Sequence, residues 1–140
     1  MTSWLQPYAK WASLLYRTTG EHRVEAILRW LKKSSGWLSG LQTILPQPPG
    51  HRKYTKWMLA KTASLEIWLF CWGPNVRSSP HEYLAGEVWS KVISGILYER
   101  TGDTMRKLCT GDVGYHANYP YQIITLRPAY SIHICTPDAL

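Results

Sequence analysis

The sequence predicts a mainly β protein, a small β-barrel of the jelly-roll type preceded by an N-terminal helical segment. Three observations support this prediction. From Tyr54 onward, short apolar runs recur at regular spacing with turn residues between them. Nine Pro and ten Gly interrupt the 140 residues more often than a helical bundle tolerates. The apolar periodicity of an amphipathic helix is confined to the first fifty residues.

The N-terminal part contains the helical patterns. A length of 140 residues fits one domain, which we divide into a helical part over 1–50 and a β-barrel over 51–140. Val24, Ile27, Leu28 and Leu31 have the i, i+3, i+4, i+7 spacing of a helix over 21–33. A weaker pattern predicts a helix over 5–16, and 37–45 has room for another turn or two. Three prolines within 46–50 then predict an irregular loop.

The remainder of the chain reads as short strands. Turn residues such as Ser94-Gly95 and Gly111-Asp112 separate the apolar runs. We expect strands over 57–61, 65–72, 87–93, 96–100, 105–109, 121–126 and 130–135. Seven short strands in succession are typical of a barrel or jelly roll.

The charge is unevenly distributed along the chain. Residues 1–61 carry ten Lys or Arg and two Glu, a net charge of +8, whereas 62–140 carry a net charge of −1. The cations are spread along helical segments, which favours a solvated helical face over a nucleic-acid surface. Nucleic-acid binding through residues 1–61 stays open as a further hypothesis, ranked below the two functions described at the end of this section, because no RNA-binding or zinc-finger motif supports it. We expect a monomer that binds neither nucleic acid nor membrane.

The cysteines and the N-terminus indicate the compartment. Three cysteines at scattered positions form neither a disulfide framework nor a Cys-x-x-Cys metal pattern. No basic segment followed by an apolar core begins the chain, so we expect no secretory signal. The longest apolar stretch, 57–72, contains Lys61 and Glu66 and is too short to span a bilayer. The sequence therefore predicts a reducing, cytoplasmic setting.

The most informative segment runs from Cys71 to Tyr83, with the sequence Cys-Trp-Gly-Pro-Asn-Val-Arg-Ser-Ser-Pro-His-Glu-Tyr. It reads as a strand followed by a turn that carries a candidate metal ligand, His81. His116 and the strand Ser131-Ile-His133-Ile-Cys135 follow downstream. A small barrel needs this order to gather imidazoles around one metal ion.

Residues 54–137 resemble the cysteine dioxygenase (thiol dioxygenase) family of the cupin superfamily. The order and spacing of the matching segments agree with the family nearly without gaps. These segments are Tyr54-Thr-Lys56, Leu69-Phe-Cys-Trp-Gly73, Ser78-Ser-Pro-His81-Glu82, Gly95-Ile-Leu-Tyr-Glu99 and Ala129-Tyr-Ser-Ile-His-Ile-Cys-Thr-Pro137. The resemblance implies a cupin-type barrel that binds one iron(II) through three histidines and adds O₂ to the sulfur of a metal-bound thiol.

The resemblance also implies roles for individual residues. His81 is the first metal ligand, and His116 is the most plausible third ligand, although it reads as a loop histidine. Tyr83 occupies the position of the second ligand. A phenol has an ordinary pKa of about 10 and must lose its proton to ligate, so it suits iron(II) poorly. His133 falls where the family has a histidine that orients ligands or substrate beside the metal.

The resemblance also assigns residues to substrate binding and to a crosslink beside the substrate. Tyr54 and Lys56 would seat the substrate carboxylate, and Lys56 replaces an arginine, so the charge remains but the bidentate fork is lost. Val88 and Cys135 occupy the positions of a tyrosine–cysteine crosslink, which therefore cannot form. Cys135 would lie close enough to meet a metal-bound ligand, but a cysteine on a core strand is usually a small apolar residue.

Glu87 offers a different completion of the metal site. His81, Glu87 and His116 would form the two-histidine, one-carboxylate face that many non-haem iron oxygenases use. The family pattern instead turns Val88 inward, and a shift of one residue along a strand moves a side chain to the opposite face.

Two functions follow from this resemblance. The first is a thiol dioxygenase that uses iron(II) and O₂ to oxidise cysteine, or a similar small carboxylate-bearing thiol, to the sulfinic acid. Tyr83, Glu87 or water would complete its metal site. The alternative is a catalytically inactive relative or binding protein that has lost the metal site.

Overall fold

The computed structural model describes residues 45–61, 65–78, 86–117 and 120–136. Almost all of the helical segment expected over 1–50 lies outside these ranges, as do His81 and Tyr83. Residues 45–50 have no regular secondary structure. Within the described residues, no helix is long and apolar enough to cross a membrane.

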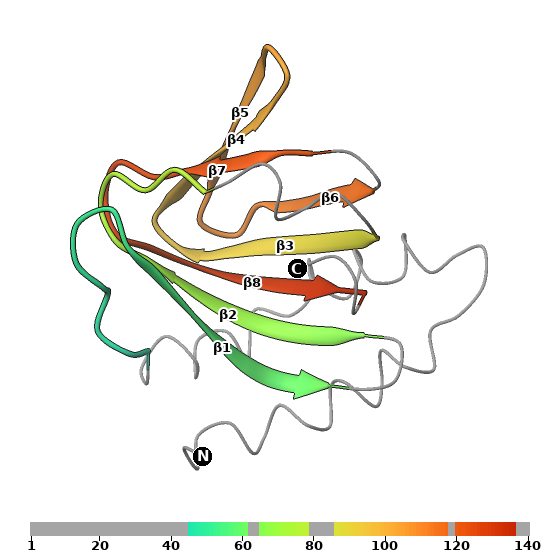
Figure 1. Ribbon diagram of the computed structural model, residues 1–140, viewed down its shortest axis with the longest axis horizontal. Helices are drawn as coiled ribbons and strands as arrows, with labels where there is room; N and C mark the ends of the chain where they lie inside the picture. The colour runs from blue at the N-terminus through green and yellow to red at the C-terminus, as the bar shows by residue number, and fades with distance from the viewer. Residues whose placement is uncertain (1–44, 62–64, 79–85, 118–119, 137–140) are drawn as a thin grey trace.

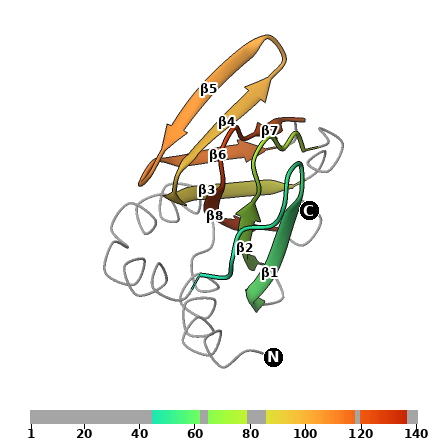
Figure 2. The same cartoon turned by 90° about the vertical axis from the view of Figure 1, so that its left-hand side faces the viewer.

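The described chain forms strands, and every pair of neighbours is antiparallel. The strands are β1 (Tyr54–Lys61), β2 (Glu66–Trp72), β3 (Glu87–Ser94), β4 (Ile96–Thr101), β5 (Thr104–Cys109), β6 (Val113–Ala117), β7 (Gln122–Ile124) and β8 (Ala129–Cys135). One sheet has the order β1-β2-β8-β3-β6 and the other β5-β4-β7. Figure 1 shows the larger sheet as one curved layer, and in both Figures 1 and 2 the β4–β5 hairpin projects beyond it. The predicted fold class, a mainly β jelly roll, is confirmed.

Three details differ from the sequence prediction. Strand β1 begins at Tyr54, three residues before the expected start at 57. Strand β6 was not predicted, because Gly111-Asp112 reads as a turn and Gly114 interrupts the apolar pattern that follows it. The strand expected over 121–126 is shorter at both ends, as β7 covers only Gln122–Ile124. The hydroxyl of Thr125 donates to the carbonyl of Gly73, which ties the chain after β7 to a loop instead of a strand.

The core lies between the two sheets. Phe70 and Trp72 of the larger sheet pack with Leu97, Leu108 and Ile123 of the smaller one, and all five are at most 2% exposed. Burying an aliphatic or aromatic side chain of this size stabilises a fold by about 1.5–3 kcal/mol. The interior between the sheets is therefore largely apolar, so any polar side chain there requires a partner.

Candidate functional site

The strand register gathers most of the predicted site residues on the inner face of the larger sheet. His133 on β8 lies opposite Trp68 on β2 and Ser90 on β3. Residues directly opposite one another in a sheet project from the same face. By the same rule, the inner face carries Tyr54, Lys56, Val88, Ser90, Gly114, His116, Ser131, His133 and Cys135.

His133 is fully buried in a hydrogen-bonded relay. The indole N–H of Trp72 donates to the Ser131 hydroxyl at 2.9 Å, and that hydroxyl lies 2.8 Å from Nε2 of His133. Burial, and next the proximity of His116, lower the pKa of His133 to about 3, so the imidazole is neutral at pH 7. Because Ser131 accepts from Trp72, it can donate its own proton to Nε2, which leaves the imidazole proton on Nδ1.

His116 lies on β6 and not in a loop, so the loop prediction was wrong. Its Nε2 contacts the carboxylate of Glu99 on β4, in the other sheet. Its ring stacks on Tyr121 with 3.8 Å between ring centroids and 12° between the planes. The imidazole is 8% exposed and Glu99 is 2% exposed. This contact joins the two sheets through a buried imidazole and a buried carboxylate.

Three buried polar atoms in this interior have no hydrogen-bond partner among the described residues. They are Oγ of Ser90, Oε1 of Glu99 and Nδ1 of His133. Gly114 leaves space between two of them, because a Cβ there would lie 3.2 Å from Ser90 Oγ and 3.3 Å from Glu99 Oε1. Buried polar atoms left without a partner destabilise a fold, which points to an occupant beside them.

A cavity of about 320 Å³ reaches the Glu99–His116 pair. Its walls come from the β4–β5 hairpin and from β6, namely Thr101, Thr104, Arg106 and Tyr115. The guanidinium of Arg106 is held in place because its Nη2 donates to the carbonyl of Val113 at 3.1 Å. The cavity thus combines a buried carboxylate, an imidazole and an arginine, which suits a small polar ligand.

The side chains of Glu87 and His116 do not lie on the same face of the sheet. Glu87 lies opposite Ala117, whereas its neighbour Val88 lies opposite His116, so the two side chains project from opposite faces of the sheet. The Glu87 carboxylate accepts a hydrogen bond of 2.8 Å from the hydroxyl of Tyr115. The described residues therefore do not assemble the alternative face in which Glu87 and His116 share a metal ion.

Lys56 and Tyr54 lie on the inner face of β1, at the edge of the larger sheet. The ammonium of Lys56 lies 4.9 Å from the centroid of the Trp68 ring, a cation–π contact. The ring of Tyr54 packs against Phe70 and Trp72, at centroid distances of 5.9 and 5.1 Å. Lys56 is exposed, so its charge remains accessible at this edge.

Cys135 is a buried thiol. Its Sγ lies 3.8 Å from the backbone carbonyl of Glu66, and it packs against Val88. Burial, and next the charge of Glu66, raise the pKa of Cys135 to about 12, against a smaller opposing effect of Lys56. At neutral pH the thiol stays protonated, which makes it a weak nucleophile and a weak metal ligand.

The described residues contain no group of three His, Cys, Asp or Glu side chains able to hold a metal ion. By themselves they therefore do not provide the three-ligand site that the resemblance implies. Sequence reasoning missed Glu99 as a site residue. The signal was present in the sequence. Leu97 and Glu99 are two residues apart on one strand, so their side chains lie on the same face, and a carboxylate beside a core leucine needs a buried partner.

Comparisons with known proteins show the cupin fold. No family model matches this sequence, and no curated protein is significantly similar to it. A cupin superfamily protein from Desulfitobacterium hafniense is 17% identical with a TM-score of 0.57, over 68% of this chain and 84% of that one. KdgF from Halomonas sp. is 17% identical with a TM-score of 0.55, over 60% of this chain and 80% of that one. A structure from a study of DMSP lyases is 19% identical with a TM-score of 0.51, over 62% of this chain and 49% of that one.

Proposed function

We propose that this cupin-fold chain is a small-molecule-binding protein whose ligand occupies the cavity above Glu99 and His116, without thiol oxidation at an iron site. The observation that carries the proposal is the buried Glu99 carboxylate. Its Oε2 contacts His116, its buried Oε1 has no partner among the described residues, and Glu99 is one of the residues that line the cavity. A carboxylate oxygen in that position selects a ligand that donates a hydrogen bond.

The surrounding groups narrow the chemical class of the ligand. Arg106 has N–H donors beyond the one given to Val113, and these suit an oxyanion. Thr101 and Thr104 add hydroxyls that both donate and accept. The best match is a small amino acid or hydroxy acid, with its ammonium or hydroxyl at Glu99 and its carboxylate toward Arg106. Cysteine belongs to this class.

Two features argue against iron chemistry as the first choice. Tyr83 stands where the resemblance requires an imidazole, and a phenol must be deprotonated to bind a metal. Glu87, the carboxylate that would replace it, projects from the face opposite His116. The implied metal site could form only if Tyr83 lost its phenolic proton or if the Glu87 side chain projected from the same face of the sheet as His116.

The second candidate is the thiol dioxygenase, with iron(II), O₂ and a small carboxylate-bearing thiol. One observation favours it. Metal-binding histidines commonly donate their other ring N–H to a carboxylate, and Glu99 contacts His116 in that manner. In this candidate His81 and His116 hold the iron. For both candidate functions we propose a monomer in the cytoplasm. The three cysteines are free thiols, which is typical of proteins in a reducing compartment.

Binding of a panel of amino acids and hydroxy acids, cysteine included, tests the first proposal by calorimetry. Glu99→Gln should weaken binding by roughly tenfold or more, because a hydrogen bond to a charged group contributes about 1.5–3 kcal/mol. The matched control is Arg100→Gln on the same strand, because Arg100 is exposed and bonds its own turn at Gly102. Equal affinity in the Glu99→Gln variant and the wild type would contradict the proposed site.

Metal content separates the two candidates. The protein is incubated anaerobically with excess iron(II), freed of unbound metal and analysed for iron per chain. We expect little retained iron in the wild type and more in Tyr83→His, which restores the imidazole that the resemblance requires. Close to one iron per wild-type chain, with oxygen uptake on thiols, would replace the binding proposal with the dioxygenase.

A further inference from the structure

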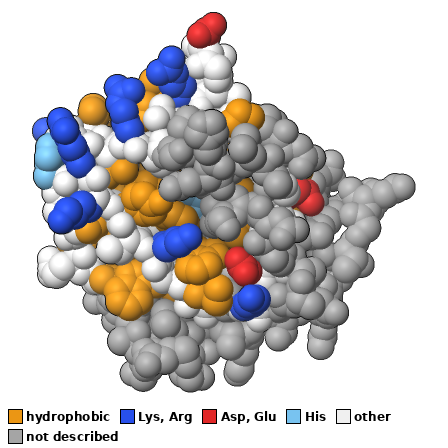
Figure 3. Space-filling view, viewed as in Figure 1, with side chains coloured by type: hydrophobic (Ala, Val, Ile, Leu, Met, Phe, Trp, Pro, Cys, Tyr) orange, Lys and Arg blue, Asp and Glu red, His pale blue; other side chains and the backbone are white. Residues whose placement is uncertain are grey.

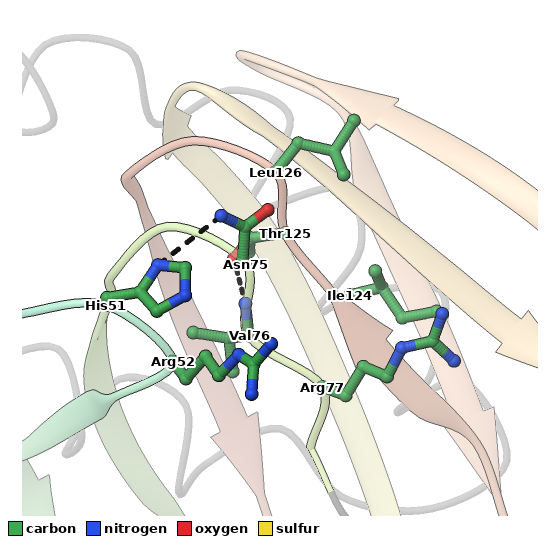
Figure 4. Close-up of a pocket in the computed structure, with 8 residues that line it drawn as sticks. All are labelled: His51, Arg52, Asn75, Val76, Arg77, Ile124, Thr125 and Leu126. Atoms are coloured by element: carbon green, nitrogen blue, oxygen red, sulfur yellow. Dashed lines mark hydrogen bonds between the residues drawn. The ribbon is translucent and has the colours of Figure 1, made fainter.

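A second cavity, of about 490 Å³, lies where three separate segments of the chain meet. His51 and Arg52 come from the segment before β1, residues 75–77 from the segment after β2, and residues 124–126 from the end of β7 and the turn that follows it. Figure 4 shows these side chains together. This cavity shares no lining residue with the one above Glu99 and His116, so a ligand here would be independent of the proposed function.

Backbone contacts hold the three segments in fixed positions. The amide of Arg52 donates to the carbonyl of Pro74 at 2.8 Å, and the amide of Gly73 donates to the carbonyl of Lys53 at 2.8 Å. The hydroxyl of Thr125 donates to the carbonyl of Gly73 at 2.8 Å, which connects the third segment. Gly73 is required at this junction, because a Cβ there would lie 2.2 Å from the carbonyl oxygen of Gly50. A wall fixed in this way loses little conformational entropy when a ligand binds.

Two residues of the wall have unusual backbone conformations. Among the described residues, the non-glycine positions with positive φ are Arg52 at 61° and Asn75 at 56°, and both line this cavity. Asn adopts this conformation readily, whereas Arg does so at a cost. The side chain of Asn75 also lies 3.4 Å from Nδ1 of His51, as the dashed line in Figure 4 shows. Local strain of this kind is common at ligand sites, and here it falls on an arginine.

The charge of the cavity is positive. Its described lining contains Arg52, Arg77 and His51 and no Asp or Glu. Neither guanidinium forms an ion pair or hydrogen bond with another described residue, and both side chains are exposed. In Figure 3, lysine and arginine side chains also gather along the left-hand margin of the molecule. Arg52 and Arg77 thus contribute two positive charges to the lining of one cavity, and its described lining holds no carboxylate to balance them, which favours an anionic ligand.

We propose that this cavity binds the phosphate group of a small phosphorylated ligand. A phosphate monoester carries a charge of about −2 at neutral pH and three acceptor oxygens, which matches two guanidinium groups from different segments. The amide of Asn75 supplies a further polar contact at the wall. A single carboxylate would balance only one of the two arginines.

Inorganic phosphate is the probe, with the full chain in phosphate-free buffer and binding followed by calorimetry or amide chemical shifts. We expect saturable binding with a Kd of about 1 mM or tighter, weakened by added salt. Arg77→Gln and Arg52→Asn should each weaken it by roughly tenfold or more. Asn is chosen at position 52 because it tolerates positive φ, and an unchanged melting temperature shows that the variant is folded.

Two matched controls and one competitor complete the test. Arg100→Gln removes an exposed arginine outside the cavity, and Glu99→Gln alters the other cavity, so both should bind phosphate with wild-type affinity. Acetate should bind at least tenfold more weakly than phosphate, since it has half the charge. Wild-type affinity in both Arg52→Asn and Arg77→Gln, no saturable phosphate binding, or equal binding of acetate would each overturn the proposal.

Discussion

Lowering the pH from about 7 to about 5 is expected to reduce the free energy of unfolding by about 2 kcal/mol through His133. The pKa of this imidazole falls from an ordinary 6.5 to about 3 in the folded protein, first because it is buried and next because His116 is near. The folded state therefore keeps His133 neutral at pH 5, whereas the unfolded chain takes up a proton below 6.5.

The sign follows from this difference in proton uptake. A depressed folded pKa means that the contribution to stability is fully present above 6.5 and is lost progressively as the pH falls toward 3. Each pH unit below 6.5 lowers the free energy of unfolding by about 1.4 kcal/mol, so the step from 6.5 to 5 accounts for about 2 kcal/mol.

Urea unfolding followed by tryptophan fluorescence, repeated at several pH values, measures this effect. His133→Gln cannot take up a proton in this range, so its stability should depend on pH less steeply by the same 2 kcal/mol. The two proteins differ only at position 133, so the difference between their curves reports on His133. His51→Gln removes an exposed histidine and serves as the control for the substitution itself.

Parallel curves of stability against pH for the wild type and His133→Gln would refute the reasoning. Such a result would mean that His133 is accessible to protons in the folded state, which contradicts its complete burial. A constant offset between the curves is a separate effect. It would report the loss of the contact with Ser131 and would leave the pH argument intact.

Two further predictions concern packing and thiol chemistry. Gly73→Ala should destabilise the fold by about 1–3 kcal/mol or more in urea unfolding, because the new Cβ meets backbone oxygens, whereas Gly50→Ala, with open space around it, should stay within about 0.5 kcal/mol of wild type. Equal stabilities would contradict the proposed loop junction. A thiol reagent at neutral pH should titrate one cysteine, the exposed Cys109, because burial raises the pKa of Cys71 to about 11 and of Cys135 to about 12. Fast reaction of all three without denaturant, or no loss of the reactive thiol in Cys109→Ser, would contradict this.

The strand prediction succeeded where the local pattern was strong. The apolar runs over 87–93 and 130–135 match β3 and β8, whose residues are mostly buried, and the family pattern that turns Val88 inward, and not Glu87, agrees with the strand register. It failed at β6, because Gly114 breaks the local pattern and is explained only by Ser90 and Glu99 on two other strands. Local periodicity carries no information about neighbours that distant in the chain.

The sequence by itself determined the fold class and the approximate strand positions, because short apolar runs separated by turn residues are a local signal. The tertiary structure decided which polar groups meet. Glu99 and His116 come from different sheets and are 17 residues apart, and their contact depends on the register of both. The same holds for Arg52 and Arg77, whose cavity exists only because three segments are hydrogen-bonded to one another. Register and loop docking arise from long-range packing, which no local pattern in a single sequence specifies.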